Sequence, residues 1–519
     1  MKRIVSLLLC VLMVFSLSLP AFAAAEPEEY PTIYVTGAQT NDIYSAEGER
    51  IWDLDVDAMA VVKQAIKPCL EELLTGMASR DYKAYAETVN SYVAPIFEKV
   101  VLDKNGEASN GSHPAKHSSS VEVEEKYSGY GIWDYRFWYD WRLSPIVTAE
   151  ELKDYIDRVT EATGKEKVQL VGRCYGANVI QTYITLYKDH ALENVSDISY
   201  FASSVMGIDY MSALFSGVVV LDDKAVSNFV QYFLEEEELI EDDVLSGFVY
   251  ALIEVFRYAE ILGIGTDTLL LLFDEIKYDL IPTLLPNIIG SWASYWSMVT
   301  ADKYEEAIEF IYGDRKDEYA GLIEKTDRYH YEVQLCVEET ILELQDKGIN
   351  FYIFSKYGFP DMPLYDGAAN ESDSTTSVPR QSFGAECSDF GETFSDEYIN
   401  SLSDTTYLSP DYKINAASAL IPERSWFVKG LHHDWFGELH DMTLEIMRYD
   451  MTVHNEKYPQ YLLRVNSDTL VPVTESDDDY VKSTQGIVGA AIRLLTAFIR
   501  VLTNIINGKL SLDLSGLIG

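Results

Sequence analysis

A short apolar stretch that runs into two closely spaced glycines constrains the fold of this chain most strongly. Residues 168–171 read as a strand, and the next five residues have the pattern Gly-X-Cys-X-Gly with Cys174 at its centre. In this pattern a strand turns sharply into a helix, and the glycines let the backbone pass close to its neighbours. The central side chain is then held exposed above a sheet. Serine is its usual occupant, so Cys174 predicts either a thiol nucleophile or a site whose chemistry is lost.

Helices and short apolar strands alternate around this turn. Strands are expected at residues 30–36, 168–171, 197–201, 349–354 and 424–429. A helix is expected to begin with the capping box Thr148-Ala149-Glu150-Glu151, and another is expected to follow Cys174. This alternation predicts an α/β protein with a mostly parallel central sheet flanked by helices.

The first residues of the chain predict export. Met1-Lys2-Arg3 is a positive segment, residues 4–19 are apolar, and Pro20-Ala21-Phe22-Ala23 ends in the small-X-small pattern of a signal-peptidase site. We therefore expect residues 1–23 to be a signal peptide. The mature protein is then secreted, either free or associated with the cell envelope.

Charge and composition exclude some partners. The chain of 519 residues carries a formal net charge of −44, which repels the phosphates of nucleic acids. His113 and His117 lie in a polar loop that supplies no carboxylate or cysteine to complete a metal site. We expect neither a metal nor a cofactor.

One motif upstream of the turn gives a family resemblance. Tyr139-Asp140-Trp141-Arg142 precedes Gly172 by about thirty residues. This combination resembles the lecithin:cholesterol acyltransferase-like branch of the α/β-hydrolases, and in particular its exported bacterial lipase/acyltransferase-like members. The resemblance spans most of residues 30–440. It implies the α/β-hydrolase fold, acyl-ester or lipid substrates, and an acid and a histidine that follow the nucleophile along the chain.

The acid is expected in the loop after the 349–354 strand. Asp373 lies in a segment similar to the acid loop of the family, although the family often has glycine where this chain has Ser374. Asp366 does precede a glycine, Gly367, and is the alternative. A solvated loop carboxylate is the non-catalytic interpretation of either residue.

The histidine is expected just past the 424–429 strand. The family has a histidine about seven residues beyond a Trp-Phe pair, which favours His433 over the adjacent His432. Together with His440 and Asp434, these histidines could alternatively bind a metal, but a zinc site needs convergent ligands and an ordered second shell.

These residues make up an acyl-transfer site. His433 would take the proton of Cys174, and Asp373 would orient the imidazolium. The helix N-terminus and Arg173 are both expected to favour the thiolate. The amides of Tyr175 and of one residue in the Gly37-Ala38-Gln39 loop, assigned here to Ala38, would hold the oxyanion. Asp140 and Arg142 are expected to form an ion pair or hydrogen-bond network around the site, with no direct catalytic role.

The remaining segments divide the chain further. Residues 30–206 and 336–470 are expected to form the two parts of the α/β-hydrolase core, and residues 207–335 a helical cap that covers an acyl pocket. The plainer interpretation of the cap is an insertion packed only on itself. Residues 474–519 read as an acidic linker and an amphipathic helix, which either contacts a lipid surface or docks on the main domain.

Four cysteines remain after removal of the signal peptide, namely Cys69, Cys174, Cys336 and Cys387. A Cys336–Cys387 disulfide is conceivable in an exported protein.

Two functions of different class follow from the sequence. The first is an acyl hydrolase or acyltransferase with a Cys-His-Asp triad, and the second is a catalytically weak relative that binds lipid or a cell-envelope partner.

Overall fold

The computed structural model describes residues 29–52, 58–119, 123, 135–220, 224–225, 228–229, 266–430, 437–466 and 469–475. The predicted signal peptide and the predicted C-terminal amphipathic helix lie outside these ranges. None of the described helices combines the length and the apolarity that a membrane crossing requires.

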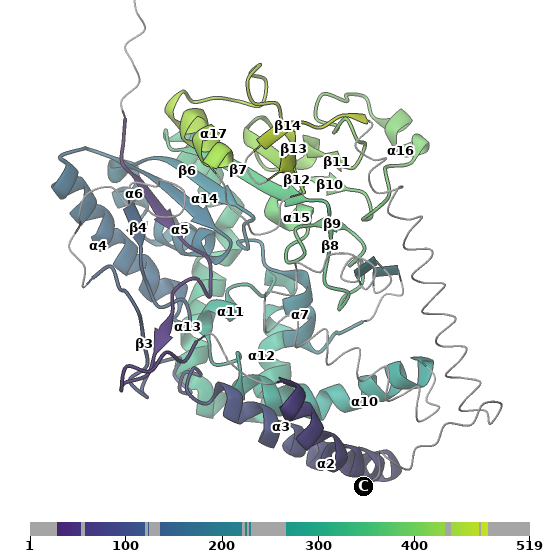
Figure 1. The fold of residues 1–519 in the computed structure, drawn as a ribbon. Coiled ribbons are helices and arrows are strands. Elements are labelled where there is room, and N and C mark those ends of the chain that lie inside the picture. Colours follow the sequence, from purple (N-terminus) through teal and green to yellow (C-terminus); the bar gives the residue numbers. More distant parts are fainter. Residues whose placement is uncertain are drawn as a thin grey trace, which may run out of the picture.

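An eight-stranded, mostly parallel sheet forms the centre of the molecule (Figure 1). Its strands are β1 (Thr32–Val35), β4 (Tyr135–Phe137), β5 (Val168–Arg173), β6 (Val195–Phe201), β7 (Asn350–Tyr357), β12 (Ser425–Lys429), β13 (Tyr461–Asn466) and β14 (Thr469–Pro472). The spatial order is β14-β13-β12-β7-β6-β5-β1-β4, and only the β13–β14 pair is antiparallel. All five predicted strands are therefore confirmed. Because β1, β5, β6, β7 and β12 run in parallel, their carboxyl ends meet at one edge of the sheet.

Alternating side chains of these strands build two separate cores. Ile33, Val35 and Leu170 join the larger hydrophobic cluster, whereas Tyr34 and Val171 join a second cluster. This alternation follows from the two-residue period of a strand. Both faces of the sheet are thus covered, which explains why the strands read as nearly continuous apolar runs.

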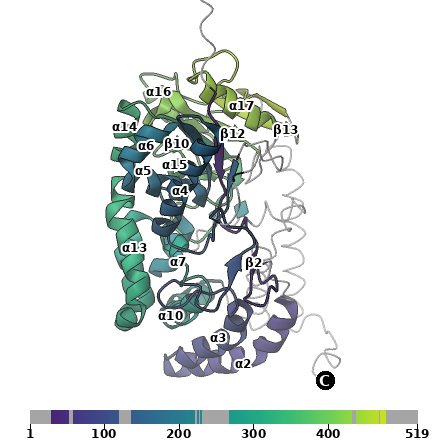
Figure 2. The same cartoon turned by 90° about the vertical axis from the view of Figure 1, so that its left-hand side faces the viewer.

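Helices cover the two faces unequally (Figures 1 and 2). The larger cluster is built with α4 (Pro145–Thr163), α5 (Tyr175–Leu186) and α14 (Val337–Asp346). On the other face the second cluster contains Leu439, Met442 and Ile446 of α17 (Gly437–Arg448). The short helix α6 (Lys188–Asn194) leads from α5 into β6.

Helix α4 begins one turn before the predicted capping box. Its N-cap is Ser144, whose side chain accepts a hydrogen bond from the amide of Ile146, and Pro145 occupies the first helical position. Serine followed by proline is a strong start signal, so Thr148 falls inside the helix. Glu151 instead pairs with His117, at 3.2 Å between carboxylate and imidazole, and this hydrogen bond raises the pKa of His117.

The predicted cap segment is helical where it is described. It contains α7 (Asp209–Ser216), α10 (Thr266–Leu284), α11 (Ala293–Trp296), α12 (Tyr304–Tyr312) and α13 (Ala320–Glu332). Trp292, Trp296 and Tyr304 belong to the same hydrophobic cluster as the sheet residue Ile33. The insertion is therefore not packed only on itself, because it shares one core with the sheet.

Two helices of the N-terminal part lie against this insertion. Helix α2 (Ala58–Ser79) pairs with α3 (Lys83–Phe97), and α3 packs against α10 in the lower part of Figure 1. Tyr82, Leu272 and Ile276 form the small cluster between them. Local sequence patterns do not reveal that α3 has this partner.

A small lobe fills the chain between β7 and β12. It holds the hairpin of β8 (Phe359–Pro360) and β9 (Glu371–Ser372), the pair β10 (Glu386–Cys387) and β11 (Ile414–Asn415), and the helices α15 (Val378–Gln381) and α16 (Asp396–Ser401). Buried ion pairs fasten it: Lys413 to Glu371 at 3.1 Å and Lys429 to Asp411 at 2.7 Å. Breaking one partner of such a pair ordinarily costs about 3–5 kcal/mol. A further two-stranded pair, β2 (Ile43–Tyr44) with β3 (His113–Pro114), lies near the first helices.

The conceivable Cys336–Cys387 disulfide is not formed, because Cys69, Cys174, Cys336 and Cys387 are all free thiols. Cys336 ends a short 3-10 turn before α14, whereas Cys387 lies on β10, where its thiol points to the carbonyl oxygen of Glu371 at 4.0 Å.

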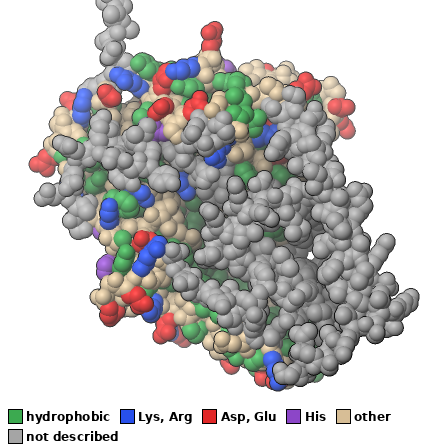
Figure 3. Space-filling view, viewed as in Figure 1, with side chains coloured by type: hydrophobic (Ala, Val, Ile, Leu, Met, Phe, Trp, Pro, Cys, Tyr) green, Lys and Arg blue, Asp and Glu red, His purple; other side chains and the backbone are tan. Residues whose placement is uncertain are grey.

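The acidic side chains visible in Figure 3 are spread over the surface and do not gather in one patch.

Candidate active site

Cys174 lies on a tight turn between β5 and α5. Its φ is 50° and its ψ is −124°, a backbone conformation that non-glycine residues rarely adopt and that costs about 1–3 kcal/mol. The amide of Cys174 donates to the carbonyl of Phe201 at 2.9 Å. A Cβ on Gly176 would lie 2.2 Å from the carbonyl oxygen of Val35, and one on Gly172 would lie 2.8 Å from the Cα of Ala177. The two glycines are therefore required for close packing, as the pattern predicts.

The loop after β1 passes directly beside this turn. A Cβ built on Gly37 would lie 3.2 Å from the Cβ of Cys174 and 3.9 Å from its Sγ. Ala38 follows, half-buried, and the amide of Tyr175 is directed at Cys174. The two residues expected to form an oxyanion hole, Ala38 and Tyr175, thus lie on segments that meet at Cys174.

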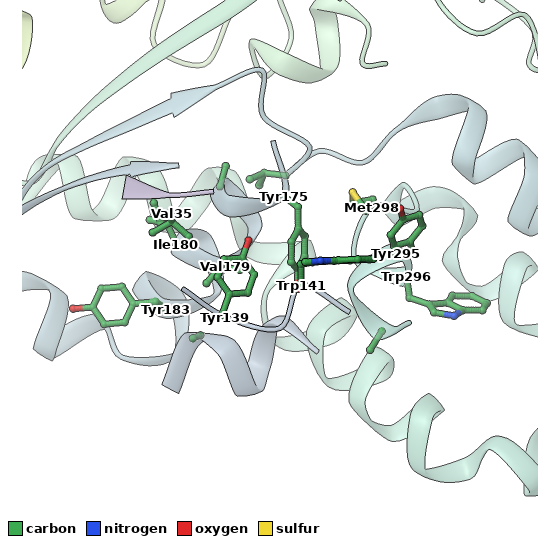
Figure 4. Close-up of a cluster of buried hydrophobic side chains, with 14 of the residues drawn as sticks. Val35, Tyr139, Trp141, Tyr175, Val179, Ile180, Tyr183, Tyr295, Trp296 and Met298 are labelled. Atoms are coloured by element: carbon green, nitrogen blue, oxygen red, sulfur yellow. The ribbon is translucent and has the colours of Figure 1, made fainter. Parts of the chain in front are cut away.

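The Tyr-Asp-Trp-Arg motif holds this loop in place. The hydroxyl of Tyr139 donates to the carbonyl of Thr36, and the indole N–H of Trp141 donates to the carbonyl of Asn41 at 2.9 Å. Figure 4 shows Trp141 and Tyr175 between the sheet residues and Tyr295 and Trp296 of α11. The aromatic members of the motif therefore join the loop, the core and the insertion.

The charged members of the motif form the expected ion pair. Arg142 is fully buried and binds Asp140 in a bidentate manner, with Nε–Oδ1 at 2.9 Å and Nη2–Oδ2 at 2.7 Å. The remaining guanidinium hydrogens reach the carbonyl of Val100 at 3.1 Å and the hydroxyl of Ser112 at 2.9 Å. The pair ties the chain at Val100 and Ser112 to the β4–α4 connection, and its hydrogen bonds do not include Cys174.

Of the two candidate acids, Asp373 is the one near Cys174. Asp373 is completely buried directly after β9, and its negative charge raises the pKa of the Cys174 thiol. Its Oδ1 accepts hydrogen bonds from the amides of Thr375 at 3.0 Å and Thr376 at 2.8 Å. Asp366 is exposed.

The departure from glycine at position 374 is accommodated by strain. Ser374 has a φ of 74°, the left-handed conformation that glycine adopts freely. Its amide donates to the hydroxyl of Ser372 at 2.9 Å, and its own buried hydroxyl has no hydrogen-bond partner in the described part of the chain. The backbone at this position therefore has a shape that suits glycine, although the residue is serine.

The two candidate histidines, His432 and His433, lie outside the described residues. The structure places the strand that leads to them: β12 is parallel to β7 and ends at Lys429, and the amide of Gly430 donates to the carbonyl of Tyr357 at 2.9 Å. His440, also considered as a metal ligand, is buried on α17 beside Asp441 at 3.0 Å. The described residues contain no cluster of three or more potential metal ligands.

The thiol of Cys174 is not biased toward the thiolate as expected. Burial raises its pKa above the ordinary value, and the charge of Asp373 raises it further. Arg173 and the amide of Tyr175 lower the pKa of the thiol, as expected, but burial and Asp373 outweigh them. The sequence could not reveal this balance because it depends on desolvation.

A polar network under Cys174 was missed by sequence reasoning. The hydroxyl of Ser204 lowers the pKa of the Cys174 thiol, against the larger effect of burial, and donates to the side-chain carbonyl of Asn178 at 2.8 Å. The Asn178 amide in turn donates to the carbonyl oxygens of Ser204 at 3.3 Å and Ser297 at 3.1 Å. The available signal was positional: Ser204 follows β6, at the same sheet edge as Cys174.

A second carboxyl also lies close to the candidate acid. Asp361 is fully buried; this burial, with the nearby charges of Asp209 and Asp373, raises its pKa to about 7. Tyr365 donates a hydrogen bond to it at 2.7 Å, and the Met362 amide at 2.8 Å.

Asp209 links the insertion to the acid loop. At the start of α7 it accepts two hydrogen bonds from Arg380, at 3.0 and 2.8 Å, and one from Ser377 at 3.1 Å. Arg380 and Ser377 follow Asp373 closely in the chain. The insertion therefore braces the segment that carries the candidate acid.

No protein-family model matches this sequence, and no curated protein matches it.

Proposed function

We propose that this chain is an exported acyl hydrolase or acyltransferase that acts through Cys174, His433 and Asp373. The observation that carries the proposal is the pairing of a strained turn at Cys174 with a buried carboxylate, Asp373, that acts electrostatically on it. Strained residues and buried interacting titratable groups concentrate at functional sites.

The strand order supports the α/β-hydrolase fold as the finer description of the architecture. In that fold the nucleophile follows a central parallel strand, the acid follows a later strand, and the histidine follows the next strand. Here β5, β7 and β12 supply Cys174, Asp373 and the segment leading to His433.

The position of β12 also supports His433 as the base. His432 and His433 follow Gly430 by two and three residues, so an extended chain could carry either one at most about 10 Å from Gly430. The adjacent strand β7 leads into the loop of Asp373. Neighbouring side chains point in different directions, so only one of the two histidines can face Cys174.

The mechanism follows from these positions. His433 accepts the thiol proton as the sulfur attacks the ester carbonyl, and the imidazolium is stabilised by Asp373. The amides of Tyr175 and Ala38 bind the oxyanion. Collapse of this tetrahedral intermediate expels the alcohol, which takes the proton from His433. A thioester remains on Cys174. Water or another alcohol, deprotonated by His433, then releases the acyl group.

The raised pKa of Cys174 gives the histidine a larger part in this mechanism. A neutral thiol at rest must lose its proton during the attack, as a serine hydroxyl does, so general-base catalysis is required. The same observation favours the second candidate function, a catalytically weak relative that binds lipid or an envelope partner, because a neutral thiol is a poor nucleophile.

Hydrolysis of p-nitrophenyl esters of graded chain length decides between the two. We expect turnover by the wild type, loss of at least about a thousandfold in Cys174→Ala, and a loss of comparable size in Asp373→Asn but not in the matched variant Asp366→Asn. His433→Gln and His432→Gln form a second matched pair, of which only the first should abolish turnover. No turnover by the wild type with any ester would support the binding function.

A further inference from the structure

Arg173 precedes Cys174 in the chain and has no partner for its charge among the described residues. Its side chain forms no ion pair or hydrogen bond in the described part of the chain, and its Nε is buried without an acceptor. Leaving a buried donor unsatisfied costs about 1–3 kcal/mol. An unsatisfied guanidinium donor beside Cys174 therefore needs a structural or functional explanation.

The surroundings make an unpaired arginine unexpected. The chain has 84 acidic and 40 basic residues, so most guanidinium groups can find a carboxylate. The two other buried or half-buried arginines described above do so: Arg142 binds Asp140, and Arg380 binds Asp209. Arg173 is partly exposed and is unpaired within the described ranges.

Its position at the end of β5 brings its backbone beside the turn that carries Cys174. Arg173 is the last residue of β5, in register with Phe201 of β6, and is followed immediately by Cys174. Its carbonyl oxygen lies 3.3 Å from a Cβ built on Gly37, where the loop after β1 meets the turn. Its charge reaches the Cys174 sulfur.

We propose that Arg173 binds a carboxylate group of the substrate, next to the acyl group that reacts at Cys174. A guanidinium can hold a carboxylate through two parallel hydrogen bonds. One unpaired positive charge matches a monoanion, and Asp209, Asp361 and Asp373 close to the site oppose a more highly charged group. In a chain of net charge −44 an anionic substrate gains only from such a local cation.

This inference rests on the proposed function, but its first test does not need turnover. Iodoacetate and iodoacetamide differ in carrying a carboxylate or a neutral amide, and in both reactions the thiolate forms the S–C bond and expels iodide. Alkylation of Cys174 by each reagent is followed by peptide mass spectrometry in wild type and Arg173→Gln. Because both reagents meet the same thiolate, a changed thiolate fraction cancels in the ratio of the two rates.

We expect the iodoacetate-to-iodoacetamide ratio at Cys174 to fall at least about tenfold in Arg173→Gln. Arg173→Lys keeps the charge and should retain part of the preference. Arg328→Gln, an exposed residue of α13 paired with Glu332, makes the same change in net charge and should leave the ratio unaltered. Should Arg173→Gln fail to fold, the wild-type ratio at Cys174 is compared with that at Cys69 in the same molecule. Equal ratios in wild type and Arg173→Gln, or at the two thiols, overturn the proposal.

A second test uses the p-nitrophenyl monoester of succinate and p-nitrophenyl butyrate, which share the acyl length. Arg173→Gln should lose at least about tenfold more kcat/KM on the succinate ester, chiefly through KM. Equal losses on both esters would assign Arg173 to thiol activation alone and contradict carboxylate binding. If neither ester is turned over but the alkylation ratio falls, the carboxylate site stands and the proposed acyl function fails.

Discussion

At the scale of single residues, the site combines a nucleophile that is predictable from sequence with an environment that is not. The Gly-X-Cys-X-Gly pattern identifies Cys174, whereas the burial that distinguishes Asp373 from the exposed Asp366 is known only from the fold. Ser204, Asp361 and Asp209 carry no motif, because their proximity to Cys174 arises from strand order and loop packing. Desolvation reverses the expected bias of the Cys174 thiol for the same reason.

The protonation of Cys174 gives the first prediction. Since burial and Asp373 raise its pKa, the thiolate is scarce at neutral pH, and the rate of iodoacetamide alkylation should rise with pH to an inflection above about 8.5. Ser204→Ala removes a hydroxyl that lowers the pKa of this thiol and should move the inflection higher. Ser203→Ala, equally buried and adjacent, is the control, and an inflection below 8 in the wild type would contradict this balance.

Asp361 gives a prediction about stability. Its pKa is about 7 in the folded protein and about 3.8 when unfolded, so the folded state keeps a proton that the unfolded chain releases between these values. This contribution to the free energy of unfolding is therefore full below pH 4 and is lost as the pH rises through 7, by up to about 4 kcal/mol. Urea unfolding at several pH values should show a smaller decline in Asp361→Asn. An unchanged decline would assign the effect to other groups.

At the scale of elements, the strands were predicted better than the helices. Residues in the central parallel strands are apolar on both faces, and this leaves a clear signal in the sequence. The start of α4 was misplaced because Thr148-Ala149-Glu150-Glu151 imitates a capping box, while Ser144 and Pro145 supply the cap used. The pairing of α3 with α10 joins segments nearly two hundred residues apart, which no local pattern encodes.

The packing of α5 on β1 yields a prediction for the elements. In Gly176→Ala the new Cβ would meet the Val35 carbonyl oxygen at 2.2 Å, so the turn must open and the protein should lose at least about 3 kcal/mol of stability. Gly437→Ala, at the exposed start of α17 with nothing within 4 Å, is the matched control and should be neutral or slightly stabilising. Thermal unfolding measures both. Equal melting temperatures for the two variants would contradict the close packing.

At the scale of the whole molecule, one sheet and its larger hydrophobic cluster unite segments that the sequence divides. The insertion shares the larger hydrophobic cluster with the strands, and through Asp209 it braces the acid loop. The sequence identified the helical character of the insertion, but its contacts with α2, α3 and the loop after β1 are three-dimensional. Gln39 of that loop, for example, donates to the hydroxyl of Tyr295 at 2.5 Å.

Net charge sets a property of the whole chain. A formal charge of −44 produces self-repulsion that salt screens, whereas the buried ion pairs are screened little. The midpoint of urea unfolding should therefore rise between about 10 mM and 300 mM sodium chloride, where the Debye length falls from about 30 Å to less than 8 Å. A midpoint that falls with salt would show that exposed ion pairs outweigh the repulsion.

Trapping the acyl group tests most directly whether Cys174 is the nucleophile. Wild type and Cys174→Ala are mixed with p-nitrophenyl butyrate, quenched in acid at short times and analysed by intact-protein and peptide mass spectrometry. We expect the mass of the wild type to increase by one butyryl group, located on Cys174. We expect His433→Gln to be acylated far more slowly. Acylation at another residue, or ester hydrolysis by Cys174→Ala at the wild-type rate, would contradict Cys174 as the nucleophile.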